Sequence, residues 1–298
     1  MTTDALGIGF IGAGWMGRAH AHVLHTISHI APLAQRLRLV AVAGRSPERV
    51  ERVARDFGFE RWTTRWEEVI EDPAVDVVAN LAPNQLHTAP SIAALELGKP
   101  VLCEKPLGRN ASEAREMLAA AEATGVTHCC GFNYRPLSAS HAASSPPGSS
   151  VRFATFGRST YRTGPAPRAG PATGASGRPR TEAARSATTR TSPISCGISV
   201  GSPRASARTP RSSVLVTQPE HPFLERWWAP GHILGWEHTF APQWLEFLSA
   251  VLDDRPVSGD QASFEDGYRA AVVCDAVLAS AQEGRRVRVA DVEAAVHQ

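Results

Sequence analysis

The stretch that decides the fold of this chain is GIGFIGAGWMG, residues 7–17. Its first five residues predict a short buried strand, and a helix is predicted from Trp15 to Leu24. Between them, Gly12 permits a tight turn, Gly14 lets a pyrophosphate approach the backbone, and Gly17 lets helix and strand pack closely. The pyrophosphate then lies at a helix N-terminus, which favours anions. We predict a dinucleotide-binding turn made of Gly12, Ala13, Gly14, Trp15, Met16 and Gly17.

The second predicted strand, Leu39 to Ala43, ends in Gly44-Arg45-Ser46 and lacks the carboxylate that often holds an NAD ribose. Arg45 and Ser46 suit a 2′-phosphate, because a guanidinium matches phosphate geometry. Ser46 with Pro47 also fits the cap and first turn of the helix that follows, and both roles can hold together. The pattern favours NADP over NAD as cofactor and leaves NAD open.

Strand and helix patterns alternate up to about residue 132, which predicts a parallel, doubly wound sheet. The further predicted strands are 75–79, 101–103 and 126–131, and the further helices include 90–97 and 111–123. Ligands of such sheets bind beyond the carboxyl ends of the strands. Three polar segments lie at such ends: Ala82-Pro83-Asn84 with His87, Glu104-Lys105-Pro106, and Asn133-Tyr134-Arg135. We predict cofactor contacts from Ala82, Pro83, Asn84, His87, Glu104 and Lys105, while His87 equally suits a surface position at a helix start.

Composition sets limits on compartment and partners. A length of 298 residues fits one large or two ordinary domains, and a net charge of +2 gives no bulk argument for nucleic-acid binding. The five cysteines are odd in number and lack metal-ligand spacing, so they predict reduced, mostly buried thiols and no metal site. The chain enters its first strand almost at once and has no bilayer-length apolar run, so we expect a cytoplasmic protein without membrane partners.

Residues 8–135 resemble the glucose–fructose oxidoreductase / inositol dehydrogenase (Gfo/Idh/MocA) family. The resemblance rests on the glycine turn, on APNQLH at 82–87, on GKPVLCEKPL at 98–107 and on GFNYR at 131–135. It implies a Rossmann domain and NAD(P)-dependent oxidoreduction of a sugar, cyclitol or related polyol. It also implies a homo-oligomer built through a C-terminal sheet. We expect several strands of that sheet to be scrambled or lost in this chain, so the sequence leaves that assembly open.

By this likeness Lys105 is the catalytic lysine beside the nicotinamide, where its ammonium relays the proton of a substrate hydroxyl while hydride leaves carbon. The chain contains only two lysines, so a lysine at this position is not background composition. Glu104 is expected to orient Lys105 or the nicotinamide edge. The plain alternative is a solvated lysine, as expected for Lys99. The predicted substrate contacts are Lys105, Tyr134, Arg135 and His232.

Residues 137–213 differ from the rest, with eleven arginines, no lysine or aspartate, and Glu182 as the one acidic residue. A disordered basic linker is the plain interpretation, and a nucleic-acid-binding tail is disfavoured by the lack of interleaved aromatic residues. Our hypothesis is a shifted reading frame in a shortened region. With GC-rich codons, the shift over 182–194 permits a glycine-rich helix start with an Asp and a His that resembles the family's catalytic helix, and over 151–164 it permits a strand-like pattern.

From about residue 214 the family pattern returns, with PEHP at 219–222 and WWAPGHILGWEH at 227–238. Aromatic residues from 236 to 247 recur at helical spacing and predict core packing, whereas His232 and His238 suit either the substrate or packing. Ser263 to Asp266 predicts a helix start, the helix runs to about residue 282, and Arg286 to Val289 is predicted as a strand.

The predicted architecture is α/β, a doubly wound parallel Rossmann sheet followed by a smaller, incomplete α+β C-terminal domain. The expected boundaries are 1–136 for the NAD(P)-binding domain, 137–213 for the irregular segment, and 214–298 for the remainder of the C-terminal domain. Two functions compete: a polyol dehydrogenase that uses Lys105, and a catalytically impaired relative that binds the dinucleotide but lacks a complete substrate site.

Overall fold

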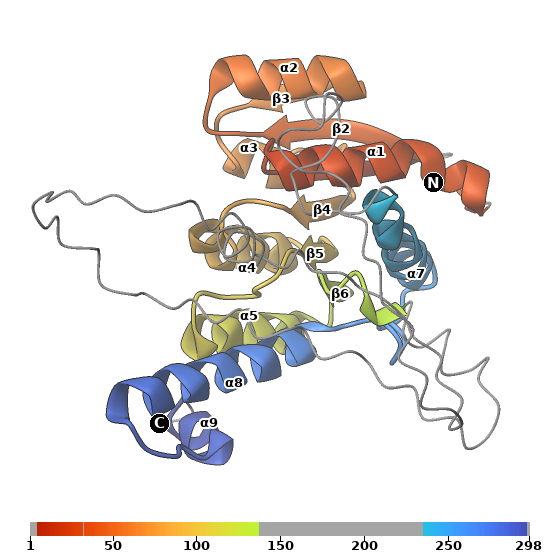
Figure 1. Ribbon diagram of the computed structural model, residues 1–298. Coiled ribbons are helices and arrows are strands. Elements are labelled where there is room, and N and C mark those ends of the chain that lie inside the picture. The colour runs from red at the N-terminus through yellow and green to blue at the C-terminus, as the bar shows by residue number, and fades with distance from the viewer. Residues whose placement is uncertain (1–4, 32, 137–234, 297–298) are drawn as a thin grey trace, which may run out of the picture. The chain divides into compact units, whose positions relative to one another are not determined.

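The computed structural model describes residues 5–31, 33–136 and 235–296. Six strands among them form one parallel sheet in the order β3-β2-β1-β4-β5-β6 (Figure 1). Their bounds are β1 Ala5–Ile11, β2 Arg36–Ala43, β3 Arg61–Thr63, β4 Val77–Asn80, β5 Val101–Cys103 and β6 His128–Cys130. The reversal of strand order at β1 and β4 confirms the predicted doubly wound α/β sheet, a Rossmann-like fold.

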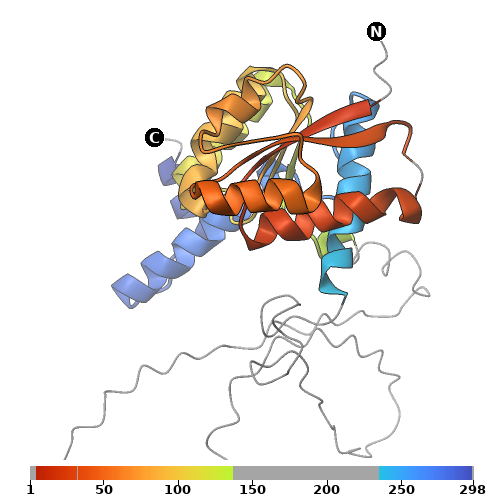
Figure 2. The ribbon, with the colours of Figure 1, turned by 90° about the horizontal axis from the view of Figure 1, so that it is seen from above.

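Helices cover the sheet on both faces. The helical elements up to residue 124 are α1 Trp15–Ile30, α2 Pro47–Phe57, α3 Glu67–Ile70, the 3-10 turn η1 Asn84–Leu86, α4 Thr88–Glu96 and α5 Ala111–Thr124. Those after residue 235 are the 3-10 turn η3 Trp236–Thr239, α7 Phe240–Leu252, α8 Phe264–Glu283 and α9 Val289–Val296. Helix α7 packs against α1, and α8 packs against α5 and β6, as Figures 1 and 2 show.

The late helices therefore complete the layers of the Rossmann sheet. The described residues 237–296 belong to the same compact unit as the described residues up to 136. The first turn of α8 carries a capping box, in which Ser263 and Asp266 satisfy each other's backbone N–H groups. This cap confirms the predicted helix start and holds Phe264 in the core.

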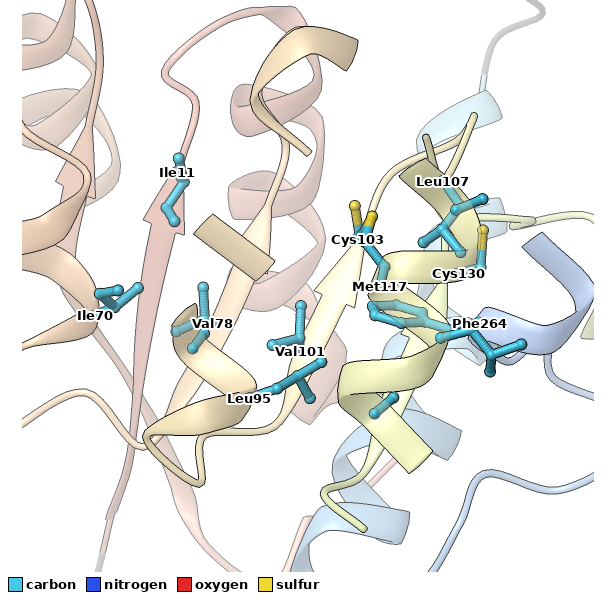
Figure 3. Packing of buried hydrophobic residues seen from close by; sticks show 14 of the residues in the cluster. Ile11, Ile70, Val78, Leu95, Val101, Cys103, Leu107, Met117, Cys130 and Phe264 are labelled. Carbon is cyan, nitrogen blue, oxygen red and sulfur yellow. The ribbon is translucent and has the colours of Figure 1, made fainter. Parts of the chain in front are cut away.

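The core is built from side chains that alternate across the sheet. Ile11 faces the layer of α4 and α5, where Figure 3 shows it in one cluster with Val78, Leu95 and Phe264. Its neighbour Phe10 is fully buried on the other face, where its ring stacks on that of Trp244 from α7, with centroids 6.4 Å apart. Burial of each such large apolar side chain contributes about 1.5–3 kcal/mol of hydrophobic free energy.

Three of the cysteines are buried, free thiols, as their apolar strand context predicted. Cys103 ends β5 and Cys129 and Cys130 lie in β6. Burial raises the pKa of all three thiols well above the usual range, so they lie in the core as unreactive neutral groups. Cys274 on α8 is exposed.

Two details of the secondary structure differ from the sequence prediction. Arg61–Thr63 and Glu67–Ile70 form β3 and α3, which were not predicted because each is too short to show a period. The predicted strand at 286–289 is wrong: this stretch is an exposed loop, and Val289 begins α9. A strand needs a ladder partner, and this exposed arginine-rich loop pairs with no described strand. The predicted irregular segment 137–213 lies outside the described residues.

Candidate functional site

In the glycine turn between β1 and α1, each of the three glycines lies in a different environment. Gly12 has φ +120°, and a Cβ there would lie 2.4 Å from the carbonyl oxygen of Leu81. A Cβ on Gly17 would lie 2.2 Å from the carbonyl oxygen of Gly12, so α1 approaches the turn as closely as its backbone permits. A Cβ on Gly14 would meet nothing within 4 Å, so this backbone faces open space at the N-terminus of α1. An anion can reach that helix end without obstruction.

The turn after β4 is held by a residue that the sequence analysis missed. Asn80 is fully buried, and its amide nitrogen donates to the carbonyl oxygens of Leu86 and His87 and to the hydroxyl of Ser91, at 2.9–3.0 Å. These bonds fix the course of residues 82–87, which include the predicted cofactor contacts Ala82, Pro83 and Asn84. A buried asparagine at the end of an apolar strand is the signal that could have revealed it.

His87 joins this turn to the next one. Its Nδ1 lies 2.7 Å from the carbonyl oxygen of Pro106, and its Nε2 lies 2.9 Å from that of Ala82. The side chain is almost fully buried, at 1% exposure, so the surface position considered for it is wrong. His87 ties the turn after β4 to the turn after β5, and a direct contact with the cofactor stays a prediction.

Lys105 lies exposed in the turn immediately after β5. Its backbone N–H donates to Oε2 of Glu104 at 3.1 Å, and Glu104 is buried with 4% exposure. Glu104 also contacts Nε2 of His20, on α1, through Oε1 at 3.1 Å. The glutamate therefore faces the protein interior and holds the lysine's backbone, which leaves the side chain of Lys105 directed to the exposed side of the turn.

The residues after β6 contact the late helices. The amide of Asn133 donates to Oγ1 of Thr239 at 2.5 Å. Arg135 donates to the carbonyl oxygen of Gly259 and forms an ion pair with Asp266. Burial opposes the charge of Asp266, but hydrogen bonds from Arg135 and Ser263 outweigh burial and lower the pKa of this carboxyl. Arg135 is thus engaged by α8, and its predicted substrate contact remains a prediction.

Of the remaining predicted substrate residues, the structure describes one and not the other. Tyr134 is partly exposed, at 39%, and His232 lies outside the described residues. Both substrate assignments stay predictions.

The turn between β2 and α2 holds the residues predicted to select the cofactor. Arg45 is exposed, and Ser46 occupies the N-cap position of α2 but makes no side-chain cap bond. The hydroxyl of Ser46 instead donates to Oε2 of Glu48 at 2.9 Å. Hydrogen bonds from its own backbone N–H and from Ser46 lower the pKa of Glu48. A charged carboxylate therefore lies beside the residues predicted to contact a 2′-phosphate.

The strand order brings the chief elements of the site together. β1, β4 and β5 are adjacent and parallel, so the glycine turn, residues 82–87 and the Lys105 turn follow one another along one edge of the sheet. This edge can hold an extended dinucleotide, with its pyrophosphate at α1 and one end toward Lys105. Within 5–136 and 235–296, no cluster of His, Cys, Asp or Glu could hold a metal ion, and no helix is long and apolar enough to cross a membrane.

A parallel sheet with this glycine turn defines the class of Rossmann dinucleotide-binding proteins. Residues 6–132 match the family described as "Oxidoreductase family, NAD-binding Rossmann fold", GFO_IDH_MocA. Over these residues the chain matches the Gfo/Idh/MocA oxidoreductase family, as the resemblance predicted.

The proteins that resemble the chain include two curated dehydrogenases and one solved structure. Levoglucosan dehydrogenase of Pseudarthrobacter phenanthrenivorans is 39% identical over 133 residues, which are 44% of this chain and 34% of that protein. The scyllo-inositol 2-dehydrogenase (NAD(+)) of Bacillus subtilis is 36% identical over 125 residues, 42% of this chain and 35% of that protein. A levoglucosan dehydrogenase complex with NADH and levoglucosan is 25% identical, with TM-score 0.62, covering 94% of this chain and 98% of that one. The chain spans about a third of the length of the curated relatives it matches.

Proposed function

We propose that this protein is a nicotinamide-dependent oxidoreductase that moves hydride between the cofactor and a sugar, cyclitol or related polyol. The observation that carries the proposal is the placement of Lys105, two strands from the glycine turn on the same sheet edge. Relatives named as dehydrogenases of levoglucosan and scyllo-inositol support the substrate class. The family match covers residues 6–132, where the cofactor turn and Lys105 lie.

The residues of the turn suit this chemistry. The first-turn N–H groups of α1, reached across the open backbone of Gly14, would hold the pyrophosphate. The bound nicotinamide supplies or accepts the hydride. The side chain of Lys105 would hydrogen-bond the substrate oxygen: as the neutral amine it would take the hydroxyl proton when a polyol is oxidised, and as the ammonium it would return a proton to the carbonyl oxygen in the reverse reaction. Glu104 holds the lysine's backbone in place.

Cofactor choice rests on the turn between β2 and α2. We propose that Arg45 and Ser46 receive a 2′-phosphate and give a modest preference for NADP. Glu48 opposes this preference, because its carboxylate already accepts the hydroxyl of Ser46 and would repel a second anion. The balance between Arg45 and Glu48 therefore sets how far the two cofactors differ in affinity.

Binding and turnover test the proposal separately. The full chain is titrated with NADH and NADPH by fluorescence, then assayed on a polyol panel that includes levoglucosan and scyllo-inositol. Cofactor-dependent turnover that Lys105→Ala abolishes without loss of binding supports the proposal. Binding without any turnover would favour the catalytically impaired relative, and failure to bind either cofactor would contradict both.

We place the protein in the cytoplasm, on the support of its buried free thiols.

A further inference from the structure

A buried chain of hydrogen bonds runs from a late helix to the turn of Lys105. Nε1 of Trp244, on α7, donates to Nδ1 of His20, on α1, at 3.0 Å. Nε2 of His20 contacts Oε1 of Glu104 at 3.1 Å, and Oε2 of Glu104 accepts the backbone N–H of Lys105 at 3.1 Å. Trp244 and His20 are fully buried, so water does not compete for these bonds.

The donor at one end fixes the direction of the whole chain. An indole N–H can only donate, so Nδ1 of His20 accepts and carries no proton. The ring proton of His20 is then on Nε2, where it donates to the carboxylate of Glu104. Each link thus has a set donor and a set acceptor, and both oxygens of Glu104 are engaged.

Packing leaves these side chains little freedom to move. The His20 ring lies 4.5 Å from that of Phe240 and 5.8 Å from that of Trp244, measured between centroids. Glu104 is packed as closely: a Cβ on Gly131 would lie 2.9 Å from Oε1 of Glu104 and 3.0 Å from the Cα of Glu104. The carboxylate therefore fills the space left by the missing side chain of Gly131, against the end of β6.

We propose that His20 is a positioning residue. Through Glu104, it couples the position of α7 to the position of the Lys105 backbone. The lysine lies exposed after a short strand, and Glu104, the last member of this Trp244–His20–Glu104 relay, accepts its backbone N–H. A shift of about 1 Å at a catalytic group can cost roughly 100-fold in rate, so such a contact bears on turnover. This inference rests on the proposed function for its kinetic consequence, and its structural core is tested without turnover.

His20→Gln and His20→Leu form the matched pair. Glutamine can accept from Trp244 and donate to Glu104, as the neutral histidine does, whereas leucine can do neither. We expect His20→Leu to lower kcat by about 10- to 100-fold, with the dissociation constant for the nicotinamide nucleotide within about threefold of wild type. His20→Gln is expected to restore kcat to within about threefold and to leave its pH profile unchanged, because no proton transfer through His20 is involved.

A spectroscopic signal reports the relay directly. The chain contains two lysines, so labelling with 15N-lysine gives two backbone amide signals, assigned by Lys99→Arg. The Lys99 N–H donates to the carbonyl oxygen of Ala94 and serves as an internal control. We expect His20→Leu and Trp244→Phe to move the Lys105 signal while the Lys99 signal stays, and His20→Gln to leave both in place. Trp244→Phe keeps an aromatic ring in the core and removes the N–H donor, with some loss of side-chain volume.

Clear outcomes overturn the proposal. A Lys105 amide signal unchanged in both His20→Leu and Trp244→Phe would show that the turn does not depend on the relay. His20→Gln as damaging as His20→Leu in folded protein would show that the donor–acceptor pattern is not what matters. The amide signals decide the relay even where wild type turns over no polyol, so failure of the proposed function remains distinguishable.

Discussion

The guanidinium of Arg135 pairs with the carboxylate of Asp266, and this contact joins the end of β6 to the first turn of α8. Asp266 also accepts the backbone N–H of Ser263, so one carboxylate caps a helix and holds a residue 131 positions earlier in the chain. The late helices are thereby anchored to the sheet edge that carries the glycine turn and Lys105.

Acid should weaken this anchor in a defined range of pH. The pKa of Asp266 is lowered in the folded state, so its stabilisation is complete above the ordinary aspartate value and is lost as pH falls through the folded pKa. We expect wild type to exceed Asp266→Asn in free energy of unfolding by up to about 1 kcal/mol at pH 7, since the pair is partly exposed. Denaturant unfolding at a series of pH values checks this; a difference that does not shrink as pH falls below the ordinary aspartate value would contradict it.

Gly12→Ala and Gly14→Ala should separate folding from cofactor binding. In Gly12→Ala the alanine must adopt a positive φ, and its Cβ clashes with the backbone of Leu81. We therefore expect the free energy of unfolding to fall by about 1–3 kcal/mol or more. Gly14→Ala meets open space and should fold normally, yet its methyl group obstructs the pyrophosphate and weakens dinucleotide binding at least tenfold, about 1.4 kcal/mol. Thermal melting and fluorescence titration measure the two effects. Tight binding by Gly14→Ala would exclude this turn as the phosphate site.

Lys105→Ala should remove turnover and retain binding. Loss of a positioned proton relay costs roughly 100- to 10,000-fold in kcat, whereas the nucleotide keeps its contacts at the glycine turn. Lys99→Ala is the matched control, since Lys99 donates from Nζ to the carbonyl oxygen of Asp72, below the start of β5. Equal rates for both variants in steady-state assays would show that Lys105 is a solvated side chain.

The turn after β2 should set cofactor preference through two opposite charges. Arg45→Ala is expected to weaken the binding of NADPH by about tenfold relative to that of NADH, equivalent to about 1.4 kcal/mol of binding free energy. Glu48→Ala should shift the ratio the other way, because it removes the carboxylate bound to Ser46. Isothermal titration of both cofactors to both variants provides the measurement. An unchanged ratio in Arg45→Ala would exclude this residue as a phosphate contact.

The reading-frame hypothesis for residues 137–213 is tested by the coding DNA. We expect the codons of 182–194 and 151–164 to yield the family-like patterns when read in the shifted frame. Codons that cannot encode those patterns would end the hypothesis, whatever the activity of the chain.

Short-range sequence patterns were enough to predict the main elements of the cofactor half and the start of α8. The glycine turn, the alternation of strands and helices, and the capping box at Ser263 are readable because each depends on residues within a few positions of one another. β3 and α3 were not predicted because three or four residues are too few to show a period. The loop at 286–289 shows that alternation of apolar and polar residues alone does not make a strand.

Tertiary structure decided which side chains support the site. His20 carries no local signal of its role, because its partners come from distant elements of the chain, and Asn80 is marked only by its place at the end of an apolar strand. Trp244 donates to a histidine 224 residues away, and Arg135 meets its carboxylate only once α8 has docked. Such pairings depend on the strand order and on the packing of helices over the sheet, which local sequence rules do not encode. The lysine at the strand end could therefore be read from the sequence, while the contacts that hold its backbone required the fold.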